Sequence, residues 1–111
     1  MVTVHRGELW TVAGGGRVSS KPRPALIVQS DLFAGSDYVT IALVTSQIVD
    51  SPVRVDVVPG ETTGLSSQSQ VMADKLQTVP RGALGTKIGS ISPSTMVNVE
   101  RAILVYLDIT S

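Results

Sequence analysis

Short apolar segments separated by turn residues run through most of this chain, which is the pattern of an antiparallel β domain. The expected strands lie at residues 9–12, 24–29, 38–44, 53–57, 69–73, 76–79 and 87–89, and the fifth and sixth are either separate or parts of one bent strand. Turn residues rich in glycine and proline, such as those at 59–64, separate them. The hydrophobic pattern therefore predicts a mainly β fold.

One helix is predicted, near the end of the sequence. Ser92 is a suitable N-cap, and Pro93 fits the first helical position, where the missing backbone donor costs nothing. Apolar residues then recur on one face at Met96, Val99, Ile103 and Tyr106. Val97, Val105 and Leu107 broaden this stripe enough to leave room for a subunit contact. We expect residues 1–111 to form a single domain, a small SH3-like antiparallel β-barrel with a C-terminal helix.

The composition limits the chemistry that such a domain holds. The chain of 111 residues has no cysteine and one histidine, His5, which excludes disulfides and cysteine- or histidine-based metal sites. We expect no metal and no cofactor. Nine basic and nine acidic residues cancel, so bulk charge does not indicate nucleic-acid binding. No apolar run has the length of a signal-peptide core or a membrane span, so the expected location is the cytoplasm.

The start of the second expected strand holds a candidate anion ligand. Arg23 lies between Pro22 and Pro24, which restrict the backbone, and a buried apolar run follows it. An arginine held in this way loses little further freedom when it binds a phosphate in bidentate fashion. The alternative interpretation is a strand-edge arginine whose aliphatic stem covers apolar surface.

Two further pairs of residues carry candidate chemistry. Thr45 and Ser46 follow the third expected strand, where two hydroxyls can donate to an oxyanion or, alternatively, only initiate a turn. Asp74 and Lys75 place opposite charges between two apolar segments. Asp74 would suit a general base if its pKa were raised, and the alternative is an ion pair at a strand edge.

Several motifs occur in a recognisable order along nearly the whole chain. They are Arg6-Gly7-Glu8-Leu9-Trp10, the segment from Arg23-Pro24 to Ser30-Asp31, Leu43-Val44-Thr45-Ser46, Gly64-Leu65 through Asp74, Leu84-Gly85, Ile88-Gly89 and Ser92-Pro93. In sequence and spacing they resemble the MazF/PemK-like toxin family, the endoribonuclease halves of bacterial toxin–antitoxin pairs. The fold implied is the barrel shared by MazF-like and CcdB-like toxins.

The resemblance implies a metal-independent, sequence-specific endoribonuclease that cuts single-stranded RNA as a homodimer and inhibits translation and growth. In this family the ribose 2′-hydroxyl attacks the adjacent phosphate, which yields a 2′,3′-cyclic phosphate and a 5′-hydroxyl. By resemblance, Arg23 stabilises the transition-state charge, Thr45 donates to a non-bridging oxygen or positions the leaving group, and Asp74 is the candidate base. The residues expected to bind RNA are Arg17, Ser19, Lys21, Ser46, Lys75 and Gln77.

The resemblance also implies a partner, a cognate antitoxin whose acidic, partly disordered tail covers the RNA groove. Two other hypotheses stay open. A CcdB-like DNA gyrase poison shares the barrel and acts by binding, but the closing Trp-Gly-Ile of that family is absent from the end of this sequence. A non-catalytic SH3-like binding module needs an exposed aromatic groove, and the sequence has only one Trp, two Tyr and one Phe.

Overall fold

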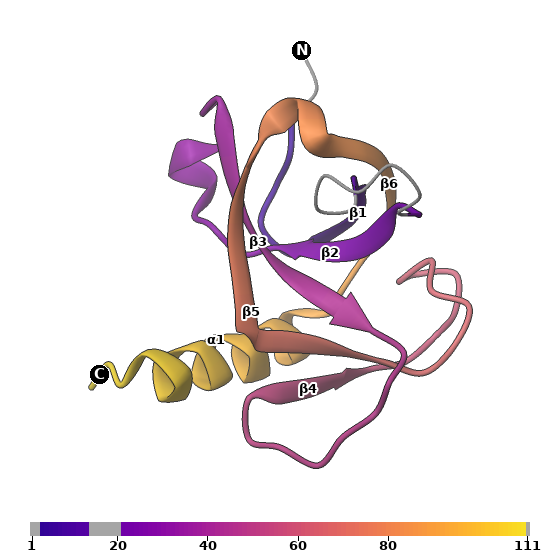
Figure 1. The fold of residues 1–111 in the computed structure, drawn as a ribbon, viewed down its shortest axis with the longest axis vertical. Coiled ribbons are helices and arrows are strands. Elements are labelled where there is room, and N and C mark those ends of the chain that lie inside the picture. The colour runs from indigo at the N-terminus through magenta and orange to yellow at the C-terminus, as the bar shows by residue number, and fades with distance from the viewer. Residues whose placement is uncertain (1–2, 14–20, 111) are drawn as a thin grey trace.

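The computed structural model describes residues 3–13 and 21–110, and it arranges them as one curved sheet with a helix across one side (Figure 1). The strands are β1 (Glu8–Val12), β2 (Arg23–Ile27), β3 (Tyr38–Thr45), β4 (Arg54–Val57), β5 (Ser69–Pro80) and β6 (Leu84–Ser90). The helix is α1 (Pro93–Leu107), and two 3-10 turns lie at Asp31–Phe33 and Arg81–Ala83. The predicted mainly β fold with a C-terminal helix is confirmed.

The strands follow the order β4-β5-β3-β2-β1-β6, and every neighbouring pair is antiparallel. The two expected segments at 69–73 and 76–79 form one strand, β5. Its pairing with β3 shifts register between Ala42 and Val44, where β5 carries the extra residues of a bulge. This bulge bends β5 so that the same strand pairs with β4 at one end and reaches the far end of β3 at the other.

The buried side chains form two clusters, one on each face of the sheet. Leu26 and Ile27 are neighbours on β2 and both are completely buried, yet Leu26 packs in the cluster beneath α1 and Ile27 packs in the cluster inside the curve of the sheet. Because successive side chains of a strand point to opposite faces, a strand covered on both faces is apolar at every position. This explains the unbroken apolar run after Arg23.

Helix α1 begins as the sequence predicts. The Ser92 hydroxyl accepts a hydrogen bond from the Thr95 amide at 3.2 Å, and Pro93 is the first helical residue. Met96 and Val99 are buried as expected, but Tyr106 is 50% exposed, which corrects its assignment to the buried stripe. The last turn of α1 extends beyond the sheet (Figure 1), and Val105, Tyr106 and Leu107 at this end are 61%, 50% and 48% exposed.

The long loop between β4 and β5 is fixed against β6 by two glycines. Gly64 has a φ of +72°, and a Cβ at this position would lie 1.9 Å from the Ile88 carbonyl oxygen. Gly89 packs as closely against the backbone of Thr63, and the Ser90 amide donates to the Thr62 carbonyl at 2.9 Å. Only glycine fits such contacts, and they hold the serine-rich end of this loop beside the ends of β2 and β3.

Candidate active site

A polar pocket of about 470 Å³ lies where β2 begins and β3 ends. The loops after β3 and before β5 complete its walls, and hydroxyl groups dominate the lining. The lining residues are Arg23, Pro24, Val44, Thr45, Ser46, Gln47, Leu65, Ser66, Ser67 and Ser69. Three of the residues singled out in the sequence, Arg23, Thr45 and Ser46, are therefore brought together in one pocket.

Strand register explains why Arg23 and Thr45 meet. Ala25 pairs with Leu43 and Ile27 pairs with Ile41, so continuing the same register by two residues places Arg23 directly opposite Thr45. Residues opposite each other in an antiparallel pair project from the same face, with Cβ atoms about 4.5–5.5 Å apart. The first residue of β2 and the last residue of β3 thus present a guanidinium and a hydroxyl to the same space.

Arg23 is exposed, and its side chain makes no hydrogen bond or ion pair with residues 3–13 or 21–110. Three other arginines are engaged: Arg6 pairs with Glu100, Arg54 pairs with Asp74, and Arg81 donates to backbone carbonyls. All N–H donors of a guanidinium without a protein acceptor are available to a ligand. Their planar arrangement matches two oxygens of a phosphate. The position of Arg23 therefore favours anion binding over a purely structural role.

The Thr45 side chain is oriented by its own turn. Its Oγ1 accepts a hydrogen bond from the Gln47 amide at 3.1 Å, so the hydroxyl oxygen does form the turn, as the alternative interpretation expects. Within the described part of the chain, the hydroxyl hydrogen of Thr45 donates to no protein acceptor. It is therefore available to donate to a group in the pocket.

Asp74 does not line this pocket, and its carboxylate is bound to Arg54 on β4. The Arg54 Nε and Nη2 atoms donate to the two carboxylate oxygens at 2.9 and 3.2 Å. These hydrogen bonds lower the pKa of Asp74 and outweigh the opposing effect of burial. The raised pKa that a general base needs is absent, so the structure favours a structural role for this ion pair.

The other residues expected to bind RNA lie around the pocket or beyond it. Lys21 is exposed two positions before Arg23, and Lys75 and Gln77 are exposed on β5. Gln77 pairs with Ile41, four residues from Thr45, which is about 13 Å along a strand. Arg17 and Ser19 lie outside the described residues.

Sequence reasoning missed several polar residues that the fold brings to this region. Ser66, Ser67 and Ser69 line the pocket from the loop before β5, and their clustering was the available signal. Gln70 is only 4% exposed and pairs with Thr45 across β3 and β5. The signal for Gln70 was a glutamine within an apolar strand. Its partner could not be predicted, because the Val49 backbone that it contacts lies more than twenty positions away in the sequence.

The lining residues define what the pocket can do chemically. Among the described lining residues Arg23 is the only ionisable side chain, so this part of the pocket offers one cation and several hydroxyl donors to an anion. Across residues 3–13 and 21–110, no group of three acidic, histidine or cysteine side chains is arranged to hold a metal ion. Nor does the part of the chain that the structure describes contain a helix long and apolar enough to span a membrane.

Comparisons with known proteins match nearly the whole chain. Residues 5–107 fit the family model described as PemK-like, MazF-like toxin of type II toxin–antitoxin system. A probable endoribonuclease MazF of Mycolicibacterium smegmatis is 40% identical over 107 residues, which cover 96% of this chain and 98% of that protein. Endoribonuclease MazF9 of Mycobacterium tuberculosis is 27% identical, with 97% of this chain and 99% of that protein covered.

Solved structures share the fold. The Mycobacterium tuberculosis toxin MazF-mt6 superposes with a TM-score of 0.81 at 25% identity, covering 94% of this chain and 99% of its own. An endoribonuclease in complex with its cognate antitoxin, from a mycobacterial species, superposes with a TM-score of 0.80 at 22% identity, covering 97% and 98% of the two chains. These superpositions support the same arrangement of sheet and helix.

Proposed function

The chain belongs to the PemK-like, MazF-like toxin family of type II toxin–antitoxin systems, and we propose that it is an endoribonuclease whose active site is the pocket between β2 and β3. One observation carries the assignment of the site. The guanidinium of Arg23 and the hydroxyl hydrogen of Thr45 have no acceptor among the described residues, and they face the same pocket from opposite positions on neighbouring strands. That pair suits the charge that develops on a phosphodiester during cleavage.

The reaction that fits this pocket uses a nucleophile from the substrate. The ribose 2′-oxygen forms a bond to the adjacent phosphorus, the bond from phosphorus to the 5′-oxygen breaks, and that oxygen takes a proton from water, so that the products are a 2′,3′-cyclic phosphate and a 5′-hydroxyl. Arg23 binds the non-bridging oxygens and stabilises their added negative charge, and Thr45 donates a hydrogen bond to the same group. No residue becomes covalently attached, so no serine or cysteine nucleophile is needed.

The proton of the 2′-hydroxyl needs an acceptor, and we assign it to water. An arginine stays protonated, the other described lining side chains are uncharged, and Asp74 is held by Arg54 outside the pocket. Because Arg23 is exposed, solvent reaches the reacting phosphate. In this proposal the enzyme supplies positioning and charge stabilisation rather than a general base.

The substrate proposed is single-stranded RNA cut at a short sequence motif. Arg23 and Ser46 bind the scissile nucleotide, Lys21 lies beside it, and Lys75 and Gln77 extend the binding path along β5. Arg17 and Ser19 belong to this set as predictions from the sequence. Cutting mRNA in the bacterial cytoplasm inhibits translation and growth, which is the toxic effect proposed.

The test of this function is incubation of the purified protein with mixed-sequence single-stranded RNA in EDTA, with identification of the fragment ends. We expect cleavage that leaves cyclic phosphate and 5′-hydroxyl ends. Arg23→Ala and Thr45→Ala, checked for folding by circular dichroism, should abolish it. If folded wild-type protein leaves all RNA intact, the enzyme assignment is wrong, and binding to DNA gyrase in the manner of a CcdB-like poison becomes the next test.

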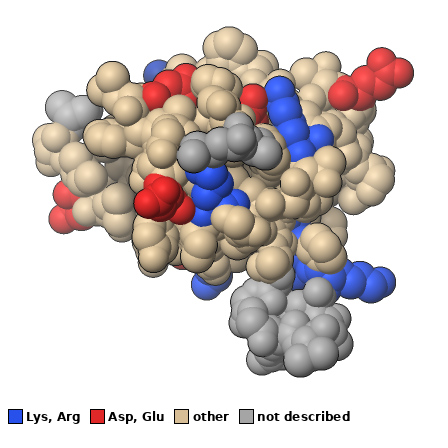
Figure 2. All heavy atoms as spheres, turned by 90° about the horizontal axis from the view of Figure 1, so that it is seen from above, with Lys and Arg blue, Asp and Glu red and all other residues tan. Residues whose placement is uncertain are grey.

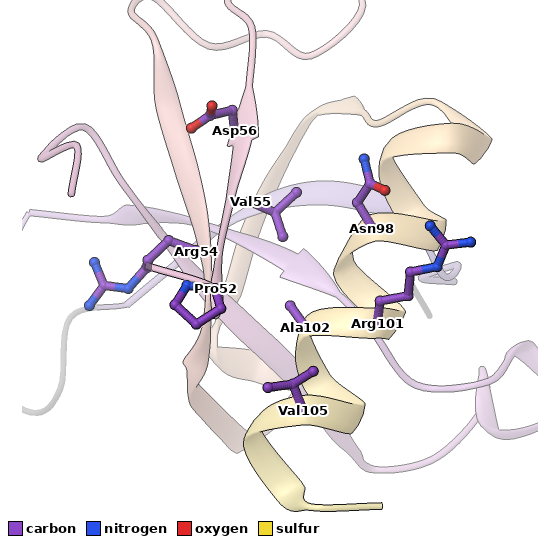
Figure 3. A pocket seen from close by; sticks show the side chains of 8 residues that line it. All are labelled: Pro52, Arg54, Val55, Asp56, Asn98, Arg101, Ala102 and Val105. Carbon is purple, nitrogen blue, oxygen red and sulfur yellow. The ribbon is translucent and has the colours of Figure 1, made fainter. Parts of the chain in front are cut away.

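We also propose that the chain acts as a homodimer through the exposed end of α1 and the groove between α1 and β4. Val105 is 61% exposed and Ile109 is 52% exposed, and such a cluster of apolar side chains marks a contact surface. Figure 3 shows Ala102 and Val105 pointing from α1 toward β4 across this groove, which Pro52 and Val55 also line.

The dimer surface predicts the effect of a charge placed on it. Val105→Asp should convert a dimer into a monomer in sedimentation-velocity experiments, because a carboxylate in an apolar contact is not solvated. Tyr38→Asp is the matched control, since Tyr38 is 58% exposed at the start of β3, away from the groove. A wild-type monomer at all concentrations, or dimers in both variants, would contradict the proposed surface.

The partner proposed is a cognate antitoxin with an acidic, partly disordered tail. The exposed guanidinium of Arg23 suits a carboxylate as well as a phosphate. An antitoxin that places an acidic side chain on Arg23 would compete with RNA for the same pocket. Inhibition by the purified antitoxin should therefore be competitive with RNA, and inhibition that leaves RNA affinity unchanged would exclude this mode.

A further inference from the structure

One wall of the proposed RNA pocket is the loop between β3 and β4, residues 46–53. Ser46 and Gln47 at its start line the pocket, and Ile48 and Val49 are 52% and 45% exposed. An exposed loop with half-exposed apolar residues has little packing of its own to fix its shape. Its position depends on what ties its middle to the sheet.

Within the described residues, the Gln70 side chain makes that tie at the middle of the loop, and the Ala73 amide of β5 holds the end of the loop by donating to the Val53 carbonyl at 2.9 Å. The Gln70 Nε2 donates to the Val49 carbonyl at 2.9 Å, and its Oε1 accepts from the Val49 amide at 3.1 Å. The same Nε2 donates its second hydrogen to Asp56 Oδ1 at 3.0 Å. The amide therefore pairs with the loop backbone as a strand would, and both of its hydrogens and its oxygen are used.

Register places Gln70 beside the proposed catalytic pair. Gln70 pairs with Thr45 on one side and with Asp56 on the other, and Thr45 lies opposite Arg23 in the continued register of β2 and β3. The four side chains form a row across one face of the sheet. Gln70 is 4% exposed in this row, so its amide is shielded from competing water.

We propose that Gln70 is a positioning residue that holds the loop 46–53 in place as a wall of the RNA pocket. The inference rests on the proposed ribonuclease function. Thr45 itself is fixed by strand pairing with β5, so its position does not depend on the Gln70 amide. Ser46 and Gln47 follow the strand end. The Gln47 amide is held by Thr45 Oγ1, but the path of these two residues along the pocket wall continues into the loop and depends on the tie at Val49. Gln70 therefore acts on RNA binding rather than on the bond-breaking step.

Removing the amide should release the loop without unfolding the sheet. Val49 is exposed, so its amide and carbonyl can bind water once Gln70 is gone. Valine favours strands and fills part of the same space. Gln70→Val is thus expected to leave β5 intact and to free the loop. Gln70→Glu should also free the loop, because a carboxylate cannot donate to the Val49 carbonyl, and its repulsion from Asp56 should make it the less stable of the two variants.

Kinetics on an oligonucleotide spanning a mapped cleavage site test this role. We expect Gln70→Val and Gln70→Glu to raise KM about tenfold, because the loss of an ordered pocket wall should weaken RNA binding by about as much as the loss of one hydrogen bond. The kcat of both variants should stay within about twofold of wild type. Asp56→Ala keeps both bonds to Val49 and should leave KM nearly unchanged. Val99→Ala is the stability control, because it removes buried volume under α1 and should lower the melting temperature without changing KM.

Two further readouts separate this inference from the function on which it rests. Amide hydrogen exchange at Val49 should become faster in Gln70→Val and not in Val99→Ala. The dissociation constant of mixed-sequence 2′-O-methyl RNA, which cannot be cut by 2′-hydroxyl attack, should rise in Gln70→Val. If wild type binds this RNA without cutting unmodified RNA, the ribonuclease proposal fails and the binding comparison still decides the role of Gln70.

Three results would overturn the role of Gln70. The first is an unchanged KM and dissociation constant in Gln70→Val, even with faster exchange. The second is a loss confined to kcat, which would mean that Gln70 acts on Thr45. The third is a wild type that neither binds nor cuts RNA, which would remove the ribonuclease and the positioning role together.

Discussion

At the scale of single residues, the Thr45 hydroxyl has one fixed bond and one free hydrogen. Its oxygen accepts from the Gln47 amide, so donation is the role left for it in the pocket. Thr45→Ser keeps the hydroxyl and should retain most activity. Thr45→Val keeps the shape without the hydroxyl and should lower kcat by about 10²–10³, as loss of one oxyanion donor does. Single-turnover cleavage of one oligonucleotide measures both variants.

The outcome for Thr45→Val also tests where the hydroxyl acts. A donor that binds ground state and transition state alike would change KM rather than kcat. Equal activity of the valine and serine variants would exclude the hydroxyl from the reaction and leave Thr45 with its turn-forming role alone.

A second prediction concerns the proton acceptor. Because the described lining holds no carboxylate or histidine, the 2′-hydroxyl loses its proton to water in an equilibrium before attack, and we expect log kcat to rise by about one unit per pH unit between about pH 6 and pH 8.5. Folding does not confound this range, since the pKa values of Asp74 and Glu8 are both lowered and these carboxylates stay ionised throughout. A rate that is already level above about pH 5 would instead identify a carboxylate base, and Asp74→Asn would show whether Asp74 supplies it.

The candidate residues differ in how far the sequence predicts their surroundings. Arg23 and Thr45 end adjacent strands, so the strand pattern and the family resemblance both place them together. The partner of Asp74 was not predictable, because Arg54 belongs to another strand and a charged pair across a sheet has no fixed spacing in sequence. Gln70 was missed for the same reason, since Val49 lies in a loop whose path only the fold determines.

At the scale of elements, the Arg54–Asp74 pair fastens the edge strand β4 to the bend in β5. The side chains are 16% and 20% exposed, and Figure 3 shows Arg54 pointing away from the groove between β4 and α1. Asp74→Asn should lower the free energy of unfolding by about 1–2 kcal/mol at pH 7, because a charge-assisted bidentate pair becomes a neutral one. Urea denaturation measures the difference.

The pH dependence of that difference has a definite sign. The pKa of Asp74 is lower in the folded protein than its ordinary value, so the stabilisation is complete above the ordinary pKa and is lost as the pH falls through the lowered one. Wild type and Asp74→Asn should therefore begin to converge below about pH 4, and the difference should vanish only below the lowered pKa. Asp74→Asn should also retain the wild-type kcat, and a large loss of kcat in a fully folded variant would return Asp74 to the reaction.

Local signals predicted most of the elements. The Ser92-Pro93 start of α1 depends on capping and on the geometry of proline, which act within a few residues. The bend in β5 was open between two interpretations, because a bulge is defined by pairing with β3 and not by the strand itself. Tyr106 lies on the helix face that the periodicity predicts. Its burial depends on whether the sheet extends beneath it, and helical periodicity carries no information about the sheet.

At the scale of the whole molecule, charge is distributed evenly rather than gathered into a field. The sequence holds nine basic and nine acidic residues, and on the face shown in Figure 2 the two signs are scattered among uncharged side chains. Long-range attraction of a polyanion therefore contributes little. RNA must therefore be bound by the cations near the pocket and by hydrogen bonds from the hydroxyl groups of the residues that line the pocket.

Local binding predicts a modest dependence of RNA affinity on salt. The cations assigned to the RNA path are Lys21, Arg23 and Lys75, with Arg17 added from the sequence. For single strands each neutralised phosphate contributes about 0.7 to the slope of log K against log salt, so the slope should not exceed about 3 in magnitude. Fluorescence anisotropy of uncleavable 2′-O-methyl RNA over a salt series measures it. Lys75→Ala should reduce the slope by somewhat less than one, and a much steeper wild-type slope would mean that a basic surface assembled from two subunits binds the RNA.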